Sequence, residues 1–110
     1  EIYTGRTSAA SDVYKRQDLR FSESYIRSRY NSGFGPVRIK HDLSSRKVLP
    51  NIIEKAFEEV PLDWEEKLLK ENLKKYGEMP PSNLKELSKR LKFFTQRGFE
   101  QDIIRKLIKF

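Results

Sequence analysis

Hydrophobic side chains recur at helical spacing along most of this chain. The clearest stripe has the i, i+1, i+4, i+5, i+8 pattern and consists of Ile52, Ile53, Ala56, Phe57 and Val60. A second stripe, spaced i, i+3, i+7, i+10, consists of Leu84, Leu87, Leu91 and Phe94. Both place their members on one face of a helix. No segment alternates with period two over a useful length, so the pattern predicts an all-α protein without a sheet.

Weaker stripes extend this prediction to the other helices. The first helix is expected to present Phe21 and Tyr25 on one side, and the second to present Ile39 and Leu43. In the fourth helix, the expected apolar positions are Trp64, Leu68, Leu69, Leu73 and Tyr76. The last helix carries Ile103, Ile104, Leu107 and Ile108.

Glycine, proline and capping residues divide the pattern into short helices. Gly33, Gly77 and Gly98 follow helical stretches, and Pro36 and Pro50 suit the first turn of a helix. The sequence also offers two helix starts with capping-box spacing, Asp63 with Glu66 and Asn83 with Glu86. These signals predict two three-helix units, residues 18–60 and residues 61–110.

A short pattern occurs once in each unit. Arg46-x-Val48-x-x-x-Ile52-Ile53-x-Lys55 recurs as Arg97-x-Phe99-x-x-x-Ile103-Ile104-x-Lys106. In each copy a basic residue closes one helix, an apolar residue follows the turn, and a paired-Ile helix begins. Because one repeat unit rarely buries its own apolar face, the repetition predicts tandem units stacked into an elongated array. Such arrays usually bind an extended partner.

The first seventeen residues differ from the rest of the chain. This segment, residues 1–17, is rich in Ser, Ala and Thr and lacks helical apolar periodicity. Its stretch from Ser8 to Gln17 resembles the translation of a transposase-type sequencing adaptor. We therefore expect residues 1–17 to be non-native or disordered, and the natural part to run from Asp18 to Phe110 with its own N-terminus missing.

The charge of the chain is positive overall but banded. Its formal net charge is +7, and charged residues make up 35% of the 110 positions. Basic residues dominate from Arg20 to Lys47 and again from Lys67 to Phe110, whereas the stretch from Val48 to Glu66 is acidic. Two basic regions flanking an acidic band indicate a surface for a polyanion or an acidic protein groove.

Helix geometry selects candidate contact residues within the basic regions. In the first unit they are Arg27, Arg29, Arg38, Lys40 and Arg46. In the second unit they are Lys89, Arg90, Lys92 and Arg97. We expect charge-assisted contact of these side chains with carboxylates or phosphates. A lysine stripe on a solvated helix face can also serve solubility alone. Phe93 lies off the apolar stripe, where it either packs on a neighbouring helix or stacks on a base.

Catalytic and metal-binding patterns are missing from the sequence. The chain has no cysteine and a single histidine, His41, which cannot form a recognisable zinc set. It contains neither a Walker-type nor a Rossmann-type glycine loop. No nucleophile, base and orienting group form a defensible set. We therefore expect no enzyme, no metal site, no cofactor and no membrane span, and we expect a cytoplasmic monomer.

Two strings of residues carry a family resemblance. Arg20-Phe21-x-x-x-Tyr25-Ile26-x-x-Arg29, followed by Gly33-Phe34-Gly35-Pro36-x-Arg38-Ile39-x-x-Asp42-Leu43, resembles the central repeat of bacterial RecX regulatory proteins. Asp63-Trp64, then Lys75-Tyr76-Gly77-Glu78, then Arg97-Gly98-Phe99-x-x-x-Ile103 resembles their third repeat. The likeness covers essentially all of residues 18–110.

The resemblance implies both a fold and a function. RecX proteins have three tandem three-helix units in a curved, elongated molecule, of which this chain lacks the first. They bind the RecA recombinase filament on single-stranded DNA, in its helical groove. They modulate RecA in recombination, DNA repair and the SOS response, usually by lowering its ATPase, strand-exchange and co-protease activities.

Two other functions compete with this interpretation. Three short helices with a glycine turn can imitate a helix-turn-helix, which would make the chain a direct, non-specific DNA-binding module. The acidic residues Glu54, Glu58 and Glu59 argue against that alternative, because carboxylates would face phosphates. The other possibility is a structural fragment without activity, since end units that lack caps are often unstable.

Overall fold

The computed structural model describes the backbone of residues 8–110 and the side chains of residues 13–110. Six helices account for most of this part: α1 (Ser8–Asn31), α2 (Pro36–Ser45), α3 (Pro50–Glu59), α4 (Trp64–Tyr76), α5 (Leu84–Arg97) and α6 (Gln101–Leu107). No strand occurs among these residues, which confirms the all-α prediction. None of the helices described is long and apolar enough to cross a lipid bilayer.

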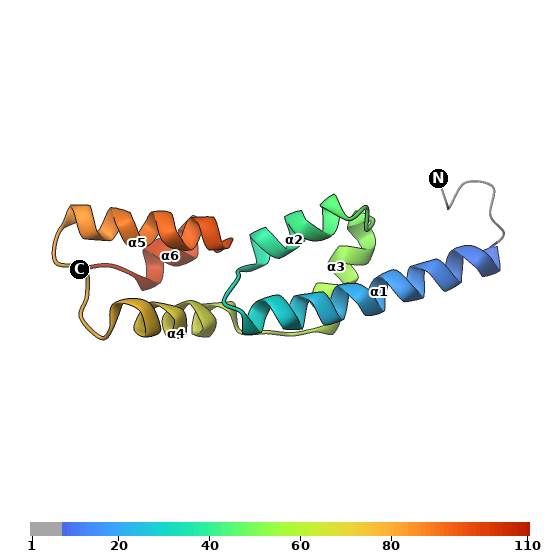
Figure 1. Cartoon of the computed structure of the whole chain (residues 1–110), viewed down its shortest axis with the longest axis horizontal. Helices are drawn as coiled ribbons and strands as arrows, with labels where there is room; N and C mark the ends of the chain where they lie inside the picture. The colour runs from blue at the N-terminus through green and yellow to red at the C-terminus, as the bar shows by residue number, and fades with distance from the viewer. Residues whose placement is uncertain (1–7) are drawn as a thin grey trace.

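The helices form two units placed one after the other along the long axis (Figure 1). The molecule measures 59 × 20 × 18 Å, so the predicted elongated shape is confirmed. Helices α1 and α4 lie end to end along one edge, and α5 and α2 lie end to end along the opposite edge (Figure 1). In the first unit α3 packs on α1 and α2, and in the second α6 packs on α4 and α5.

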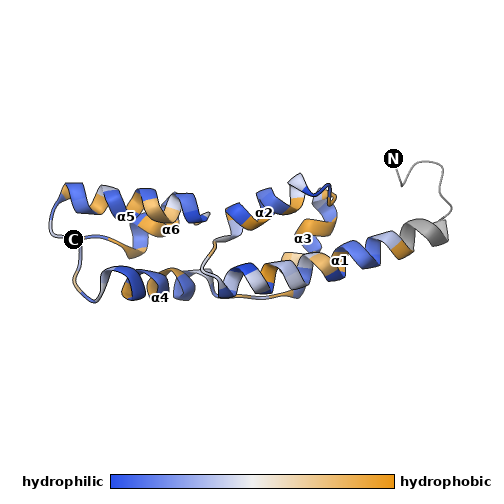
Figure 2. Ribbon diagram, viewed as in Figure 1, coloured by the Kyte–Doolittle hydropathy of each residue, from blue (hydrophilic) through white to orange (hydrophobic). Residues whose placement is uncertain are grey.

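Each unit has its own hydrophobic core. The first contains eight buried residues: Ile26, Ile39, Leu43, Val48, Ile52, Ile53, Ala56 and Val60. The second contains five, Leu68, Phe94, Phe99, Ile104 and Ile108. Trp64 packs against both clusters and so joins the two cores. Figure 2 shows hydrophobic positions gathered where the helices of each unit face one another.

The C-terminal turns of three helices share one hydrogen-bonding pattern. Phe34 N donates to Arg29 O, Val48 N to Leu43 O, and Phe99 N to Phe94 O, at 3.0, 3.1 and 3.0 Å. The residue before each donor has positive φ: Gly33 at 93°, Lys47 at 68° and Gly98 at 99°. This is the hydrogen-bonding pattern of a Schellman cap, with an apolar residue immediately after the left-handed position. The repeated pattern in the sequence therefore encodes a repeated helix end.

The predicted helix starts are also confirmed. Asp63 Oδ1 accepts a hydrogen bond from Glu66 N at 3.0 Å, and Asn83 Oδ1 accepts one from Glu86 N at 2.9 Å. Pro36 and Pro50 each occupy the first turn of their helix. These caps satisfy backbone donors that have no partner inside the helix.

Several expected core positions are instead exposed. Leu84 is 71% exposed because it is the first residue of α5, beyond the end of the core. Leu69 and Leu73 lie on the outer side of α4 and are 46% and 52% exposed. Phe21 is 43% exposed, whereas Ile26 on the same helix is fully buried. The inner face of α1 is therefore rotated from the one expected.

Helix α1 begins inside the segment that the sequence sets apart. It starts at Ser8 and continues without a break through Gln17 into the first unit. The part of residues 1–17 that is described is thus helical, while residues 1–7 lie outside the described part. This helix does not address the adaptor-like origin of the segment, which stays a prediction.

A cation–aromatic ladder as the candidate functional site

Arginine and lysine side chains alternate with aromatic rings across both units. We call this set the ladder, and its members in spatial order are Phe21, Arg46, Tyr25, Arg29, Phe34, Arg97, Phe93, Lys75 and Tyr76, with Arg38 attached at Phe34. Each cation lies 4.5 to 5.8 Å from a ring centroid, within the range of cation–π attraction. The ladder brings together four of the predicted contact residues, Arg29, Arg38, Arg46 and Arg97.

Phe34 is the centre of the ladder. Three guanidinium carbons surround its ring, those of Arg29, Arg38 and Arg97, at 5.4, 5.2 and 5.0 Å from the centroid. Arg97 comes from the second unit, and it also lies 5.1 Å from the Phe93 ring. Like charges concentrated around one ring repel one another, so the cluster favours the approach of an anion.

The arginines of the ladder have donors left for a partner. Arg29, Arg46 and Arg97 make no ion pair within residues 13–110, whereas Arg38 lies 3.8 Å from Asp42. A guanidinium that contacts a ring through its flat face keeps N–H groups at its edge, which fit a carboxylate or phosphate in bidentate geometry. The ladder therefore presents anion-binding donors next to aromatic rings.

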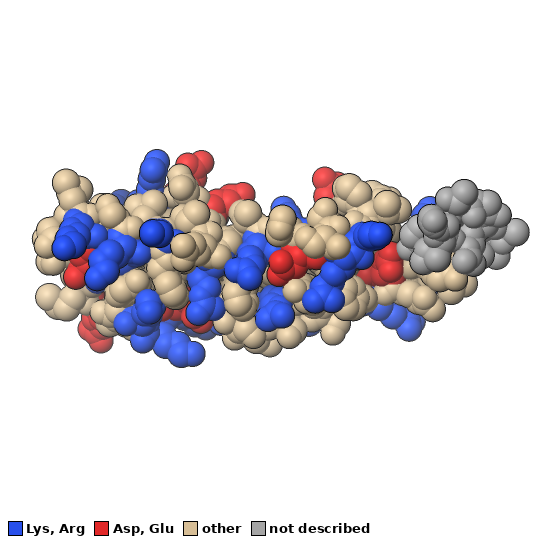
Figure 3. Space-filling view, turned by 45° about the horizontal axis from the view of Figure 1, so that its top comes forward, with Lys and Arg blue, Asp and Glu red and all other residues tan. Residues whose placement is uncertain are grey.

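The remaining predicted cations lie outside the ladder. Arg27, Lys40, Lys89 and Lys92 are all exposed. Lys40 reaches from α2 to the Phe57 ring of α3, 5.1 Å from its centroid. Figure 3 shows Lys and Arg side chains spread along both units on the face that it presents, with acidic side chains between them.

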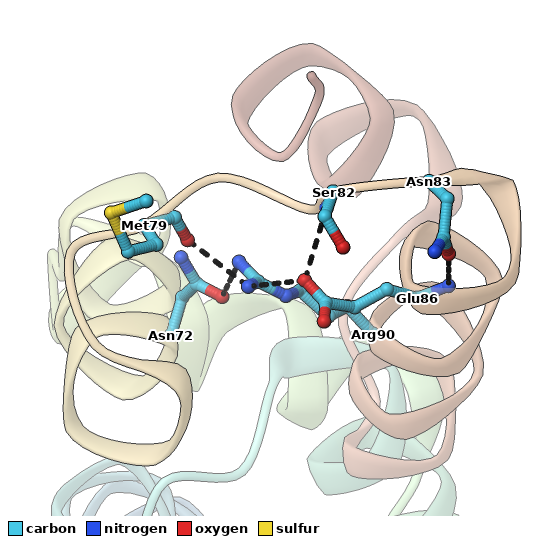
Figure 4. Close-up of polar contacts among 6 residues, drawn as sticks. All are labelled: Asn72, Met79, Ser82, Asn83, Glu86 and Arg90. Carbon is cyan, nitrogen blue, oxygen red and sulfur yellow. Dashed lines mark hydrogen bonds and ion pairs between the residues drawn. The ribbon is translucent and has the colours of Figure 1, made fainter.

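Arg90 is not part of this surface, contrary to its selection as a contact residue. Its side chain is 3% exposed, and its guanidinium points between α4 and α5 (Figure 4). Nη2 donates to Met79 O and to Glu86 Oε1, both at 3.0 Å, and Nη1 donates to Asn72 Oδ1 at 3.4 Å. The helical position alone placed Arg90 on a flank of α5, but the loop after α4 folds over that flank. We therefore assign Arg90 a structural role.

The neighbour of Arg90 has a perturbed acidity. The pKa of the Tyr76 hydroxyl is raised above its ordinary value, chiefly because the hydroxyl is buried. The charge of Arg90 opposes this shift, and the charge of Glu86 adds to it. The Arg90 guanidinium lies 4.6 Å from the centre of the Tyr76 ring. Tyr76 therefore stays neutral at physiological pH, and it takes part in the ladder through its aromatic ring.

Phe93 packs within its own unit. Its ring lies 5.0 Å from that of Phe94 and 6.2 Å from that of Tyr76, both in edge-on geometry. This agrees with the packing alternative for Phe93. Lys75 completes the arrangement at 4.5 Å from the Phe93 ring, a contact that the sequence reasoning missed. The signal was present in the Lys75-Tyr76 pair, but the position of Phe93 opposite it depends on the packing of α5.

The opposite charge is concentrated on α3. Glu54, Glu58 and Glu59 are exposed on this helix, so the acidic band predicted from the sequence is a solvent-facing surface. Within the described residues, no group of three or more His, Cys, Asp or Glu side chains could hold a metal ion.

Comparison with known proteins relates the chain to one family. Residues 18–56 match the family model described as RecX, second three-helix domain. The regulatory protein RecX of Salmonella typhimurium is 37% identical over 90 residues, and that of Legionella pneumophila is 31% identical over 94 residues. The chain belongs to the RecX family. The two RecX alignments cover 82% and 86% of this chain.

The chain spans only part of its RecX relatives. The alignments cover 54% of the Salmonella protein and 63% of the Legionella protein. The match to the RecX second-domain model runs from residue 18 to residue 56. It includes Arg29, Arg38 and Arg46, so the first half of the ladder lies within the matched domain.

Proposed function

We propose that this chain regulates the RecA recombinase by binding its filament on single-stranded DNA. Two lines of support converge on this function. Membership of the RecX family supports a regulatory role, and the ladder supplies a cationic surface that crosses both units. The observation that carries the proposal is the Phe34 cluster, where arginines of both units leave their N–H edges available to anionic groups.

The acidic helix α3 favours a mixed partner of protein and DNA. A protein that wraps naked DNA benefits from uniformly positive surfaces, since each exposed carboxylate repels phosphate. Here Glu54, Glu58 and Glu59 are exposed in the same unit as Arg38 and Arg46. A filament groove is lined by protein side chains as well as phosphates, and it can accept both signs of charge. We propose inhibition of ATP hydrolysis, strand exchange and co-protease activity as the outcome of this binding.

Direct DNA binding is the second candidate, and the ladder favours it. Alternating cations and aromatic rings occur on surfaces that bind single strands. The arginines around Phe34 could hold a sugar–phosphate backbone without any recombinase.

RecA ATPase turnover on single-stranded DNA separates the two candidates. The rate is measured with and without the chain and is then repeated with a large excess of DNA. Filament binding predicts inhibition that persists under excess DNA. Inhibition that disappears with excess DNA would favour the DNA-binding module, and no inhibition at any concentration would contradict the proposed regulation.

A further inference from the structure

The two units meet at a joint made of backbone atoms. Gly35 N donates to Arg97 O at 2.7 Å, and Val37 N donates to Gly98 O at 2.8 Å. The first N–H groups of α2 thus bind the last carbonyls of α5, two sets of groups that have no partner inside their own helices. The two helix dipoles also run head to tail across the joint, which is their favourable order. Arg38 Nη1 adds a bond of 3.4 Å to Gln96 O.

The close approach at this joint depends on glycine in both units. A Cβ on Gly35 would lie 2.5 Å from the carbonyl carbon and oxygen of Gly98. A Cβ on Gly98 would lie 2.2 Å from the Arg38 Cβ and 2.5 Å from its backbone nitrogen. These neighbours are backbone or first side-chain atoms, so a rotamer change cannot relieve the overlap. The helices would have to separate.

A second contact fixes the opposite edge of the molecule. The Tyr30 ring at the end of α1 lies 5.2 Å from the Trp64 ring at the start of α4, in edge-on geometry. The Tyr30 hydroxyl donates to Asp63 O at 3.3 Å, and Lys67 Nζ lies 5.1 Å from the Tyr30 ring. Two attachments on opposite edges prevent rotation of one unit about the other.

We propose that Gly35 and Gly98 are positioning residues that hold the two units at one angle. The joint places Arg97 of the second unit over Phe34 of the first, which makes the ladder continuous. This inference rests on the proposed function. Two contact regions that are held at a fixed spacing bind a regular filament more tightly than two independent ones, since binding of the second does not have to order it.

Gly35 offers the cleaner variant. Its φ of −92° and ψ of 172° are open to any residue, so Gly35→Ala introduces the inter-unit overlap without local backbone strain. Gly98→Ala is a second variant that adds the strain of positive φ. Gly77→Ala is the matched control, because Gly77 has a φ of +80° but no atom within 4 Å of its added Cβ.

The joint itself is tested by measuring the distance between two spin labels by double electron–electron resonance. The chain has no native cysteine, so spin labels on Ser44→Cys in α2 and Ser88→Cys in α5 report one inter-unit distance. We expect a narrow distribution in the parent and in Gly77→Ala, and a shifted or broadened one in Gly35→Ala and Gly98→Ala. Equal distributions in all four proteins, each with parent-like helicity by circular dichroism, would overturn the joint.

The consequence for function is tested on the RecA filament. We expect Gly35→Ala to require roughly tenfold more protein than Gly77→Ala for half inhibition of the ATPase. A changed distance with unchanged inhibition would overturn the positioning role. If the parent chain does not inhibit, the proposed function fails, and the spin-label distances still decide whether Gly35 and Gly98 hold the units together.

Discussion

The C-terminal ends of α2 and α5 have the same local structure and different surroundings. Both close with the same cap, in which Val48 N or Phe99 N reaches back to a carbonyl five residues earlier. At the end of α5 the left-handed residue is Gly98, and the start of α2 packs directly on it. At the end of α2 the same position holds Lys47, with a φ of 68° and an exposed side chain. Glycine is therefore required at position 98 mainly because α2 packs directly on it, and less because of the conformation of the turn.

The same alignment of helix ends pairs Ile39 with Arg90. Both residues are buried four positions before the core residue of their helix, Leu43 or Phe94. Ile39 needs no polar partner, whereas Arg90 binds the loop after α4 and two side chains. The second unit therefore uses a buried cation where the first uses a hydrocarbon. The four predictions that follow test these contrasts, beginning with the largest effect.

Replacing Arg90 is expected to destabilise the second unit most. Arg90→Ala removes the donors to Met79 O, Asn72 and Glu86, and we expect a loss of about 3 kcal/mol in the free energy of unfolding. Lys89→Ala, at the exposed neighbouring position, is expected to stay within about 0.5 kcal/mol of the parent. Urea unfolding followed by circular dichroism gives both values, and equal losses would contradict the structural role of Arg90.

Substitutions at two residues with positive φ, Gly98 and Lys47, are expected to have opposite effects on stability. Gly98→Ala should lower the free energy of unfolding by at least about 2 kcal/mol, since it combines positive-φ strain with overlap at Arg38. Lys47→Gly should raise the free energy of unfolding by up to about 1 kcal/mol, because glycine relieves the positive-φ strain at a position whose side chain is exposed. Thermal melts of both variants check the signs. A stabilised Gly98→Ala would refute the comparison.

Two ladder rings are expected to differ according to the number of cations around them. Phe34→Leu removes the ring shared by Arg29, Arg38 and Arg97, and we expect it to cost about 1 kcal/mol. Phe21→Leu, at an exposed ring contacted by Arg46, should cost less than about 0.5 kcal/mol. The difference is measured by urea unfolding of the two variants side by side. The reverse order would show that Phe34 is not the centre of the ladder.

The smallest expected effect is a dependence on alkaline pH. Burial, then the charges of Glu66 and Asp63, raises the pKa of Tyr30 above its ordinary value. The folded state therefore holds the phenolic proton more tightly than the unfolded state. The contribution of Tyr30 to the free energy of unfolding is fully present below pH 10, and it is lost as the pH rises further. Tyr30→Phe should lose less stability than the parent between pH 9 and pH 11. Equal losses of stability in Tyr30→Phe and the parent would show that Tyr30 does not cause this pH dependence.

Much of the fold could be predicted because its signals are local. Asp63, Asn83, Pro36 and Pro50 act within one turn of their own helix, so their spacing sufficed to place the helix starts. The exposure of Leu84 was not predictable in this way, since it depends on where the core ends rather than on helical periodicity.

The candidate site was only partly accessible from the sequence. Four of its arginines were selected from charge and helix geometry, but their arrangement around Phe34 depends on contact between units. Arg90 carries the same charge as Arg97 on the same helix, and only the fold of the loop after α4 buries it. In the sequence Gly35 stands just before the second helix of its own unit, whereas its close contact is with Gly98 in the other unit.

The most direct test of the account is binding of charge-neutralised chains to RecA filaments on single-stranded DNA. One variant carries Arg29→Gln and Arg46→Gln in the first unit, a second carries Lys75→Gln and Arg97→Gln in the second unit, and a third combines all four. Lys55→Gln with Lys109→Gln is a control outside the ladder that loses two charges, as many as each two-site variant.

Co-sedimentation at fixed salt measures the fraction of each protein bound. The account predicts that each two-site variant binds more weakly than the control, and that the combined variant binds most weakly of all. Equal binding of the combined variant and the parent would contradict the claim that the cations of both units contact the filament together.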